Sequence, residues 1–180
     1  MSASHFSRTS RSPMVNLRPA RESDLPHLIA LAQRSWSSAF KESAPDEFVR
    51  EWLARDFENE WYPKYWPEMT VAEIDGTVVG LVQPTKDEIN GLWVDPAAQS
   101  QGVGTALLYH GEREIASAGY DRAWLSCSGF NPNARRFYLS RGYRHVRSEA
   151  KPRAGGAIEE MCYYEFSLPR IHSSECSHSG

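Results

Sequence analysis

Residues 92–108 read LWVDPAAQSQGVGTALL and carry the clearest structural signal in the chain. Three apolar residues fit the end of a strand, and Asp95-Pro96 then turns the chain. Gly102 and Gly104 open a segment with apolar residues at helical spacing. The free amides of a helix's first turn, with the helix dipole, can hold a diphosphate. On its own the segment fits equally well a tight loop without a ligand.

Known phosphate-binding patterns do not describe this segment. It lacks the Gly-Lys-Ser/Thr of a P-loop, and Gln99 stands where a dinucleotide fingerprint has its first glycine.

A second motif, NPNARRFYLSRGY, occupies residues 131–143. Asn131 is expected to cap a helix there, with Tyr138 at the edge of the core and its hydroxyl free. In isolation, a tyrosine at such a place is more often a packing residue than a catalyst.

The remaining pattern predicts a single α/β domain. Strands are expected over residues 17–19, 69–74, 78–82, 89–94, 123–128, 143–148 and 158–166, and helices over 24–39, 46–58, 103–118 and 132–141. Residues 61–69, WYPKYWPEM, are expected to form an aromatic loop broken by proline. Gly91 inside its strand indicates a bulge or a close backbone approach. This order of elements predicts a mixed sheet with helices on both faces.

Length and composition exclude several classes of protein. The 180 residues fit one domain over 16–169, with disordered tails over 1–15 and 170–180. A hydrophobic content of 41% without a long apolar run predicts neither a membrane span nor a membrane partner. Three unpatterned cysteines fit a cytoplasmic protein better than a disulfide scaffold or a zinc site. The net charge of −3 argues against a nucleic-acid partner.

The charge is distributed unevenly along the chain. Residues 42–95 contain thirteen acidic and four basic side chains, whereas residues 97–153 contain nine basic and four acidic ones. An acidic half beside a basic half can hold a cationic ligand next to an anionic one.

Together, the two motifs resemble those of the GNAT superfamily of N-acyltransferases, which use acyl-CoA. The family patterns are Q/R-x-x-G-x-G/A and N-x-x-A-x-x-F-Y-x-x-x-G-F/Y, and both are complete here. The start of the domain, NLRPARESDLPHL, is also similar, so the resemblance spans residues 17–168. It implies a GNAT-like mixed α/β fold with a mostly antiparallel central sheet flanked by helices on both faces. It also implies acetyl-CoA as co-substrate and no metal.

The resemblance implies a cofactor site around the first motif. Residues 101–105 would offer amides to the diphosphate, and residues 92–94 would face the pantetheine arm, with the amide near Val94 holding the thioester oxygen. Asn131 would contact pantetheine, and Arg135 would approach the phosphates. The full set is Leu92, Trp93, Val94, Gln99, Gln101, Gly102, Val103, Gly104, Thr105, Asn131 and Arg135.

The resemblance also suggests the catalytic residues. Tyr138 aligns with the usual general acid, which protonates the leaving thiolate. Glu88 stands eleven residues before Gln99, where some members carry a general base, although it could equally be a solvated charge at a strand edge. These residue types suit the chemistry, because a protonated amine must lose a proton before it attacks a thioester.

The sequence therefore predicts an N-acetyltransferase that acts on a primary amine of a small cationic or aminated acceptor. Trp36 and Trp66 are expected to bind this acceptor, although the tryptophans could merely cover the core. A longer acyl donor, a protein or peptide acceptor, or a non-catalytic CoA-binding module are the alternatives. A homodimer is compatible with all of these readings.

Overall fold

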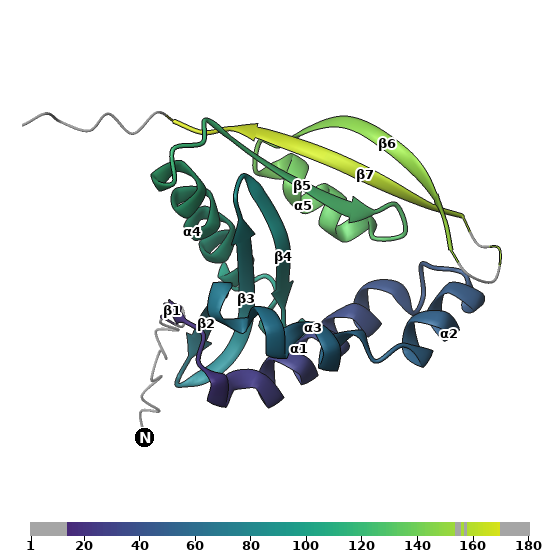
Figure 1. Ribbon diagram of the computed structural model, residues 1–180, viewed down its shortest axis with the longest axis horizontal. Helices are drawn as coiled ribbons and strands as arrows, with labels where there is room; N and C mark the ends of the chain where they lie inside the picture. Colours follow the sequence, from purple (N-terminus) through teal and green to yellow (C-terminus); the bar gives the residue numbers. More distant parts are fainter. Residues whose placement is uncertain (1–13, 154–155, 157, 170–180) are drawn as a thin grey trace, which may run out of the picture.

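The computed structural model describes residues 14–153, 156 and 158–169, which form a seven-stranded sheet with helices packed on it (Figure 1). The sheet order is β1-β2-β3-β4-β5-β7-β6. Every neighbouring pair is antiparallel except β4 with β5, which is parallel. The strands are β1 (Asn16–Pro19), β2 (Thr70–Ile74), β3 (Thr77–Thr85), β4 (Glu88–Val94), β5 (Arg122–Ser128), β6 (Arg144–Pro152) and β7 (Ile158–Ser167).

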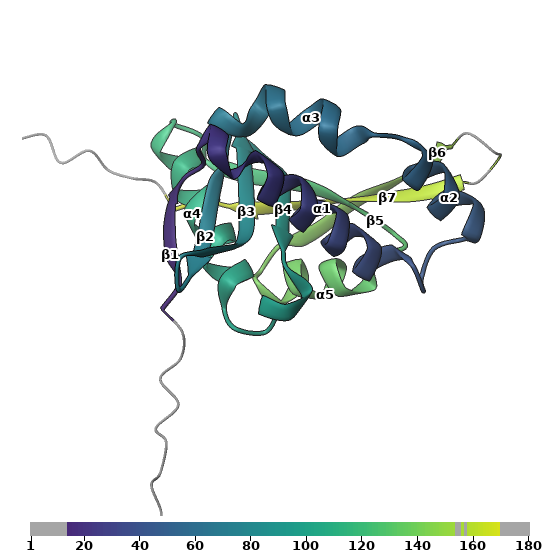
Figure 2. The same ribbon diagram turned by 90° about the horizontal axis from the view of Figure 1, so that it is seen from below.

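Helices cover both faces of the sheet, as Figure 2 shows with α3 and α5 on opposite sides. We call the side of α4 and α5 the back face and the side of α1 and α3 the front face. This arrangement confirms the predicted mixed, mostly antiparallel fold. The α-helices are α1 (Leu25–Phe40), α2 (Asp46–Ala54), α3 (Phe57–Tyr65), α4 (Val103–Ser117) and α5 (Pro132–Ser140), and the short 3-10 turns are η1 (Glu22–Asp24), η2 (Trp66–Glu68) and η3 (Pro96–Ala98).

Apolar stripes at helical spacing fix α1 and α4 on the sheet. Leu28 and Leu31 on α1 are fully buried with Val71 of β2 on the front face. On the back face, α4 packs so closely that a Cβ added at Gly111 would lie 2.7 Å from Ile89 Cδ1. Because no side chain fits there, a glycine is needed for α4 to approach β4.

The sheet opens between β4 and β5. Their single register pair joins Glu88 to Trp124, next to a hydrogen bond from Trp124 N to Asp87 O of 2.9 Å. Beyond this pair the strands diverge, so the β5-facing backbone groups of β4 have no β5 partner. The register of β4 against β3 also skips Asn90, which confirms the predicted irregularity beside Gly91.

Residues 46–65 correct the sequence-based expectation. The predicted helix over 46–58 is two helices, because Arg55 adopts an extended conformation with φ −96° and ψ 136°. The predicted loop over 61–69 is wrong over its first half, since α3 continues to Tyr65 with Pro63 inside it. Pro63 cannot donate a hydrogen bond to the carbonyl of Asn59, which is tolerable because Asn59 is exposed and water can reach that carbonyl.

The predicted tails lie almost wholly outside the described residues. Residues 1–13 and 170–180 are not described, and Met14 and Val15 precede β1 without regular secondary structure. In the described part of the chain, no helix is both long and apolar enough to cross a membrane.

Candidate active site

The start of α4 has the geometry of an anion site. Gly102 precedes the helix with φ +85° and ψ −5°, a left-handed conformation that suits glycine. The first bond within α4 runs from Ala106 N to Gly102 O at 3.0 Å, so the amides of residues 103–105 have no acceptor inside the helix. Gln101 Nε2 donates to Ala97 O at 3.0 Å and fixes the preceding turn. These are among the amides that the family resemblance assigns to the diphosphate, and that assignment stays a prediction.

Gly104 lies where α4, α5 and β4 meet. A Cβ added there would lie 3.5 Å from Phe137 Cζ and 3.6 Å from Val94 Cγ2, which are ordinary contact distances. A branched side chain would need room that these neighbours occupy. The two motifs are therefore adjacent in space, although the rest of α4 and all of β5 separate them in the chain.

The end of β4 is held by α1, which the sequence reasoning missed. Val94 O accepts hydrogen bonds from Ser35 Oγ at 3.0 Å and from Gln99 Nε2 at 3.4 Å. Arg34 Nη2 lies 2.5 Å from Asp95 Oδ2. A small hydroxyl and an arginine in succession on α1 give no signal in the sequence that they serve β4.

The side chains of β4 alternate between the two faces. Leu92 and Val94 pack with the back-face cluster, whereas Trp93 packs on the front with α1. The part of β4 that lies open toward β5 is therefore its backbone edge. An extended chain could pair with this edge as a further strand would.

Tyr138 lies on α5 with 7% of its surface exposed. Its ring centre is 5.9 Å from that of Tyr143 and 6.2 Å from that of Tyr164. Burial, and then the nearby Cys127, raise the pKa of Tyr138 above its ordinary value. Its hydroxyl is therefore protonated at neutral pH and can donate a proton.

Cys127 is poorly suited to covalent catalysis. Burial is the main cause that raises the pKa of its thiol to about 12. At neutral pH almost all of this sulfur is thiol, and the thiolate is the reactive species. Its neighbour across the β5–β7 ladder is Cys162, and both are free.

Asn131 and Arg135 both make contacts within the protein. Asn131 Oδ1 accepts from Ala134 N at 3.0 Å, so it caps α5 as predicted. Arg135 Nε donates to the Tyr164 hydroxyl at 3.2 Å. This contact ties α5 to β7. The expected approach of Arg135 to the phosphates stays a prediction.

Glu88 is half-buried on the front face. Its neighbour Ile89 points to α4 on the back face, so the alternation of the strand directs Glu88 the other way. Burial, and then the adjacent Asp87, raise the pKa of the Glu88 carboxyl. The partner of Glu88, Trp124, precedes Cys127 by three residues, which is about 10 Å along β5. Glu88 therefore lies on the front face at the joined end of the opening, whereas Tyr138 packs on the back face near Cys127, Tyr143 and Tyr164.

The two tryptophans predicted to bind the acceptor lie in different environments. Trp36 is 3% exposed and stacks on Trp52 with ring centres 4.9 Å apart, so any contact with an acceptor would need Trp36 to move. Trp66 lies in η2, half-buried against the cluster that contains Leu28.

An aromatic series along α2 and α3 was not predicted. Successive ring centres of Trp52, Phe57, Trp61 and Tyr65 lie 5.5, 5.4 and 4.2 Å apart. Trp61 Nε1 also donates to Gln83 Oε1 at 3.2 Å, which joins α3 to the front of β3. The four-residue spacing from Phe57 to Trp61 to Tyr65 was the available signal. The prolines of this segment favour a loop instead.

No cluster of three or more His, Cys, Asp or Glu side chains able to hold a metal occurs among the described residues.

Comparisons with known proteins identify the family of the chain. Residues 26–143 match the model of the acetyltransferase (GNAT) family. The uncharacterised protein YdhI of Bacillus subtilis is 28% identical over 111 residues, which cover 51% of this chain and 69% of YdhI.

Two solved structures share the fold. A GCN5-related N-acetyltransferase from Rhodopseudomonas palustris aligns with a TM-score of 0.75 and 22% identity, covering 91% of this chain and 100% of that one. The PaiA N-acetyltransferase of Thermoplasma acidophilum, solved with coenzyme A, aligns with a TM-score of 0.66 and 18% identity over 85% of this chain and 99% of that one. With its two motifs adjacent at the opening of the sheet, the chain belongs to the acetyltransferase (GNAT) family.

Proposed function

We propose that the protein transfers an acetyl group from acetyl-CoA to a primary amine of a small aminated acceptor by direct attack. The observation that carries this proposal is the opening between β4 and β5 beyond Glu88 and Trp124. The amides of α4 lie at one end of this opening and Glu88 lies on the front face at the other end, and Tyr138 would reach the opening from the back face. Two substrates can therefore approach one opening from opposite faces of the sheet.

The residues of the site fit acetyl-CoA. The amides of residues 103–105 would hold the diphosphate, and the edge of β4 over residues 92–94, which has no β5 partner, would pair with the pantetheine amides. Gln99, Gln101 and Gly102 shape the turn that presents these amides. Asn131 and Arg135 lie on α5, the neighbouring helix, and we keep them as cofactor-binding candidates. The coenzyme A complex of the PaiA enzyme supports this assignment by analogy of fold.

Acetyl-CoA supplies the thioester, and the protein supplies the proton transfers. Glu88 would take a proton from the amine, and the offset along β5 favours transfer through water. An amide of β4 near Val94 would hold the thioester oxygen as charge develops on it. Tyr138 would give its proton to the departing sulfur, since burial keeps its hydroxyl protonated.

The acceptor is a small molecule in this proposal, with a protein or peptide amine as the alternative. The aromatic series from Trp52 to Tyr65 favours a compact amine, because aromatic faces attract ammonium groups by about 0.5–2 kcal/mol. Trp66 borders this series, and Trp36 supports it through Trp52.

We place the activity in the cytoplasm, where free cysteines such as Cys127 and Cys162 stay reduced.

The deciding experiment is an acceptor screen with acetyl-CoA, read by release of free thiol and by mass spectrometry of the product. Thiol release that needs an amine, and that falls in Tyr138→Phe, would support the proposal. Binding of CoA by calorimetry without amine-dependent release would favour the non-catalytic module. Acetylation of peptides but of no small amine would favour the alternative acceptor.

A further inference from the structure

The β6–β7 hairpin presents a row of charged and aromatic side chains on the front face. Ala123 and Leu125 of β5 are buried in the back-face core, so Trp124 between them points to the front. Tyr163 lies on the same face, because its ring centre is 6.3 Å from that of Trp124. Arg147 on β6 pairs in register with Tyr163, so it shares this face too. Glu88 of β4 also points to the front and ends this row on the side away from β6.

Two cations lie over Tyr163. The guanidinium carbon of Arg147 is 3.6 Å from the centre of the ring, and Lys151 Nζ is 5.6 Å from it. Both pair with Glu149, which also accepts a hydrogen bond from the Tyr163 hydroxyl at 2.9 Å. One carboxylate therefore serves two cations, and the group keeps an excess positive charge.

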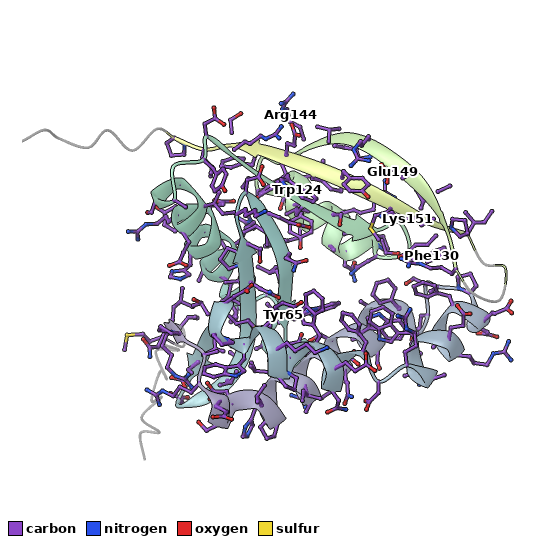
Figure 3. The ribbon with its side chains drawn as sticks, in the orientation of Figure 1. Tyr65, Trp124, Phe130, Arg144, Glu149 and Lys151 are labelled. Atoms are coloured by element: carbon purple, nitrogen blue, oxygen red, sulfur yellow. The ribbon has the colours of Figure 1, made fainter. Side chains whose placement is uncertain are left out.

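The same face is hollowed beside this group. Trp124, Arg147, Tyr163 and Glu165 line part of a hollow of about 170 Å³. In Figure 3, Trp124, Glu149 and Lys151 lie along the β5–β6 side of the molecule, and Tyr65 of α3 lies on the other side. We call the group formed by Arg147, Lys151, Tyr163 and Glu149 on this face the basic wall.

We infer that this basic wall binds an anionic group, carboxylate or phosphate, of the acceptor whose amine reacts beside Glu88. This inference rests on the proposed acetyltransferase function and names the acceptor class within it. Arg147 and Lys151 would bind the anion, and Tyr163 and Glu149 would hold both cations in place. Charged hydrogen bonds of this kind are strong enough to select a substrate.

The spacing of the strands sets the length of this acceptor. Glu88, Trp124, Glu165 and Arg144 follow one another in register across β4, β5, β7 and β6. Three strand spacings of about 4.8 Å separate the backbones of Glu88 and Arg144 by about 14 Å, and Arg147 lies further along β6, opposite Tyr163. The amine and the anion must therefore be several bonds apart. An α-amino acid, whose two groups share one carbon, is too short to reach both.

The test measures acetylation of a matched series of acceptors by the 180-residue chain with acetyl-CoA. Glycine, 4-aminobutanoate and 6-aminohexanoate vary the spacing, whereas hexylamine, 1,6-diaminohexane and 6-aminohexyl phosphate vary the far group. We expect kcat/KM to rise from glycine to 6-aminohexanoate and to exceed that of hexylamine and the diamine about ten-fold or more. The ratio between carboxylate and phosphate identifies the anion. A preference for the diamine, or indifference to the far group, would overturn the inference.

Variants distinguish the loss of anion binding at the basic wall from a general effect on folding. Arg147→Gln with Lys151→Gln should raise KM for 6-aminohexanoate about ten-fold and leave hexylamine unchanged. Arg147→Lys should retain part of the preference, because it retains the charge. Arg113→Gln is the matched control, since Arg113 lies 6.0 Å over Tyr109 on α4, away from this wall. Equal losses for hexylamine and 6-aminohexanoate would contradict the assignment.

A binding measurement distinguishes failure of this inference from failure of the proposed function. Calorimetry of 6-aminohexanoate and hexylamine with the CoA-loaded protein needs no turnover. Binding that requires the carboxylate and Arg147, with no acetylation, would refute the proposed function and support the basic wall. Acetylation with no preference for an anionic acceptor would support the proposed function and refute anion binding by the basic wall.

Discussion

Glu88 of β4 and Trp124 of β5 form the register pair at which the two halves of the sheet are joined, and the strands diverge beyond it. The pair places a half-buried carboxylate at the point of the opening. Between this pair and Val94, the edge of β4 that faces β5 has no β5 partner. One break in strand pairing therefore creates both the cofactor edge and the position of the candidate base.

Replacing Tyr138 with Phe removes the hydroxyl and keeps the ring. We expect kcat to fall about 10²–10⁴-fold, the usual contribution of general acid catalysis. CoA affinity should hardly change, because the ring packs among Phe137, Tyr143 and Tyr164 in both proteins. Steady-state kinetics and calorimetry measure the two quantities. A near-normal kcat would make Tyr138 a packing residue and leave water as the proton donor.

The raised pKa of Glu88 predicts how kcat/KM falls on the acid side of the pH profile. Burial and Asp87 raise the pKa of its carboxyl, so it protonates at a higher pH than an ordinary glutamate, whose pKa is about 4.3. A protonated carboxyl cannot accept a proton, so kcat/KM should fall as the pH drops through this raised value. Glu88→Gln should lower the rate and remove this dependence.

Glu114→Gln is the control for Glu88, because Glu114 lies on α4 with 55% of its side chain exposed. It should leave the pH profile unchanged. If Glu88→Gln keeps the acid limb of the wild type, then the limb belongs to another group and Glu88 is only a charge at the strand edge.

Two substitutions at Gly104, with side chains of increasing size, test the cofactor site. Gly104→Ala adds a Cβ at ordinary contact distance from Phe137 and Val94, so it should change CoA affinity little. Gly104→Val adds two methyl groups that must displace these neighbours or project toward the diphosphate. We expect CoA affinity to fall at least ten-fold by calorimetry, while the circular dichroism spectrum stays native. Equal affinities in a folded Gly104→Val protein would place the diphosphate elsewhere.

The sequence predicted best where one local pattern determines the structure. The glycines around Gly102, the cap at Asn131 and the apolar spacing of α4 each act within a few residues, and the structure contains all three. The bulge beside Gly91 was predicted for the same reason. The family motif supplied their mutual position, which no local pattern contains.

What the sequence missed depends on tertiary contacts. The hydrogen bond from Ser35 to Val94 and the ion pair of Arg34 with Asp95 join segments about sixty residues apart. The helix α3 forms despite Pro63, because its aromatic face packs on the front of the sheet. Chain-averaged charge was also a poor guide, since acidic Glu73 and Asp95 are engaged with Arg18 and Arg34.

Arg18 predicts how stability depends on pH. Its guanidinium lies 2.7 Å from Asp24 and 2.6 Å from Glu73, with all three side chains largely buried. The hydrogen bonds from Arg18 are the main cause that lowers the pKa of Asp24. A lowered pKa stabilises the folded state above the unfolded value of about 3.9, and this stability is lost as the pH falls through the folded value.

We therefore expect Arg18→Met to destabilise the protein by about 3–5 kcal/mol at pH 7, because it leaves two buried carboxylates without their cation. The loss should shrink as the pH approaches 3, where the Asp24 carboxyl becomes protonated in the variant. Urea unfolding at pH 7, 5 and 3 measures this change. Arg34→Met is the control, since Arg34 is 55% exposed and its pair with Asp95 should contribute about 1 kcal/mol or less. A loss in Arg18→Met that stays constant from pH 7 to pH 3 would mean that packing of the arginine chain, and not its charge, stabilises this end of the sheet.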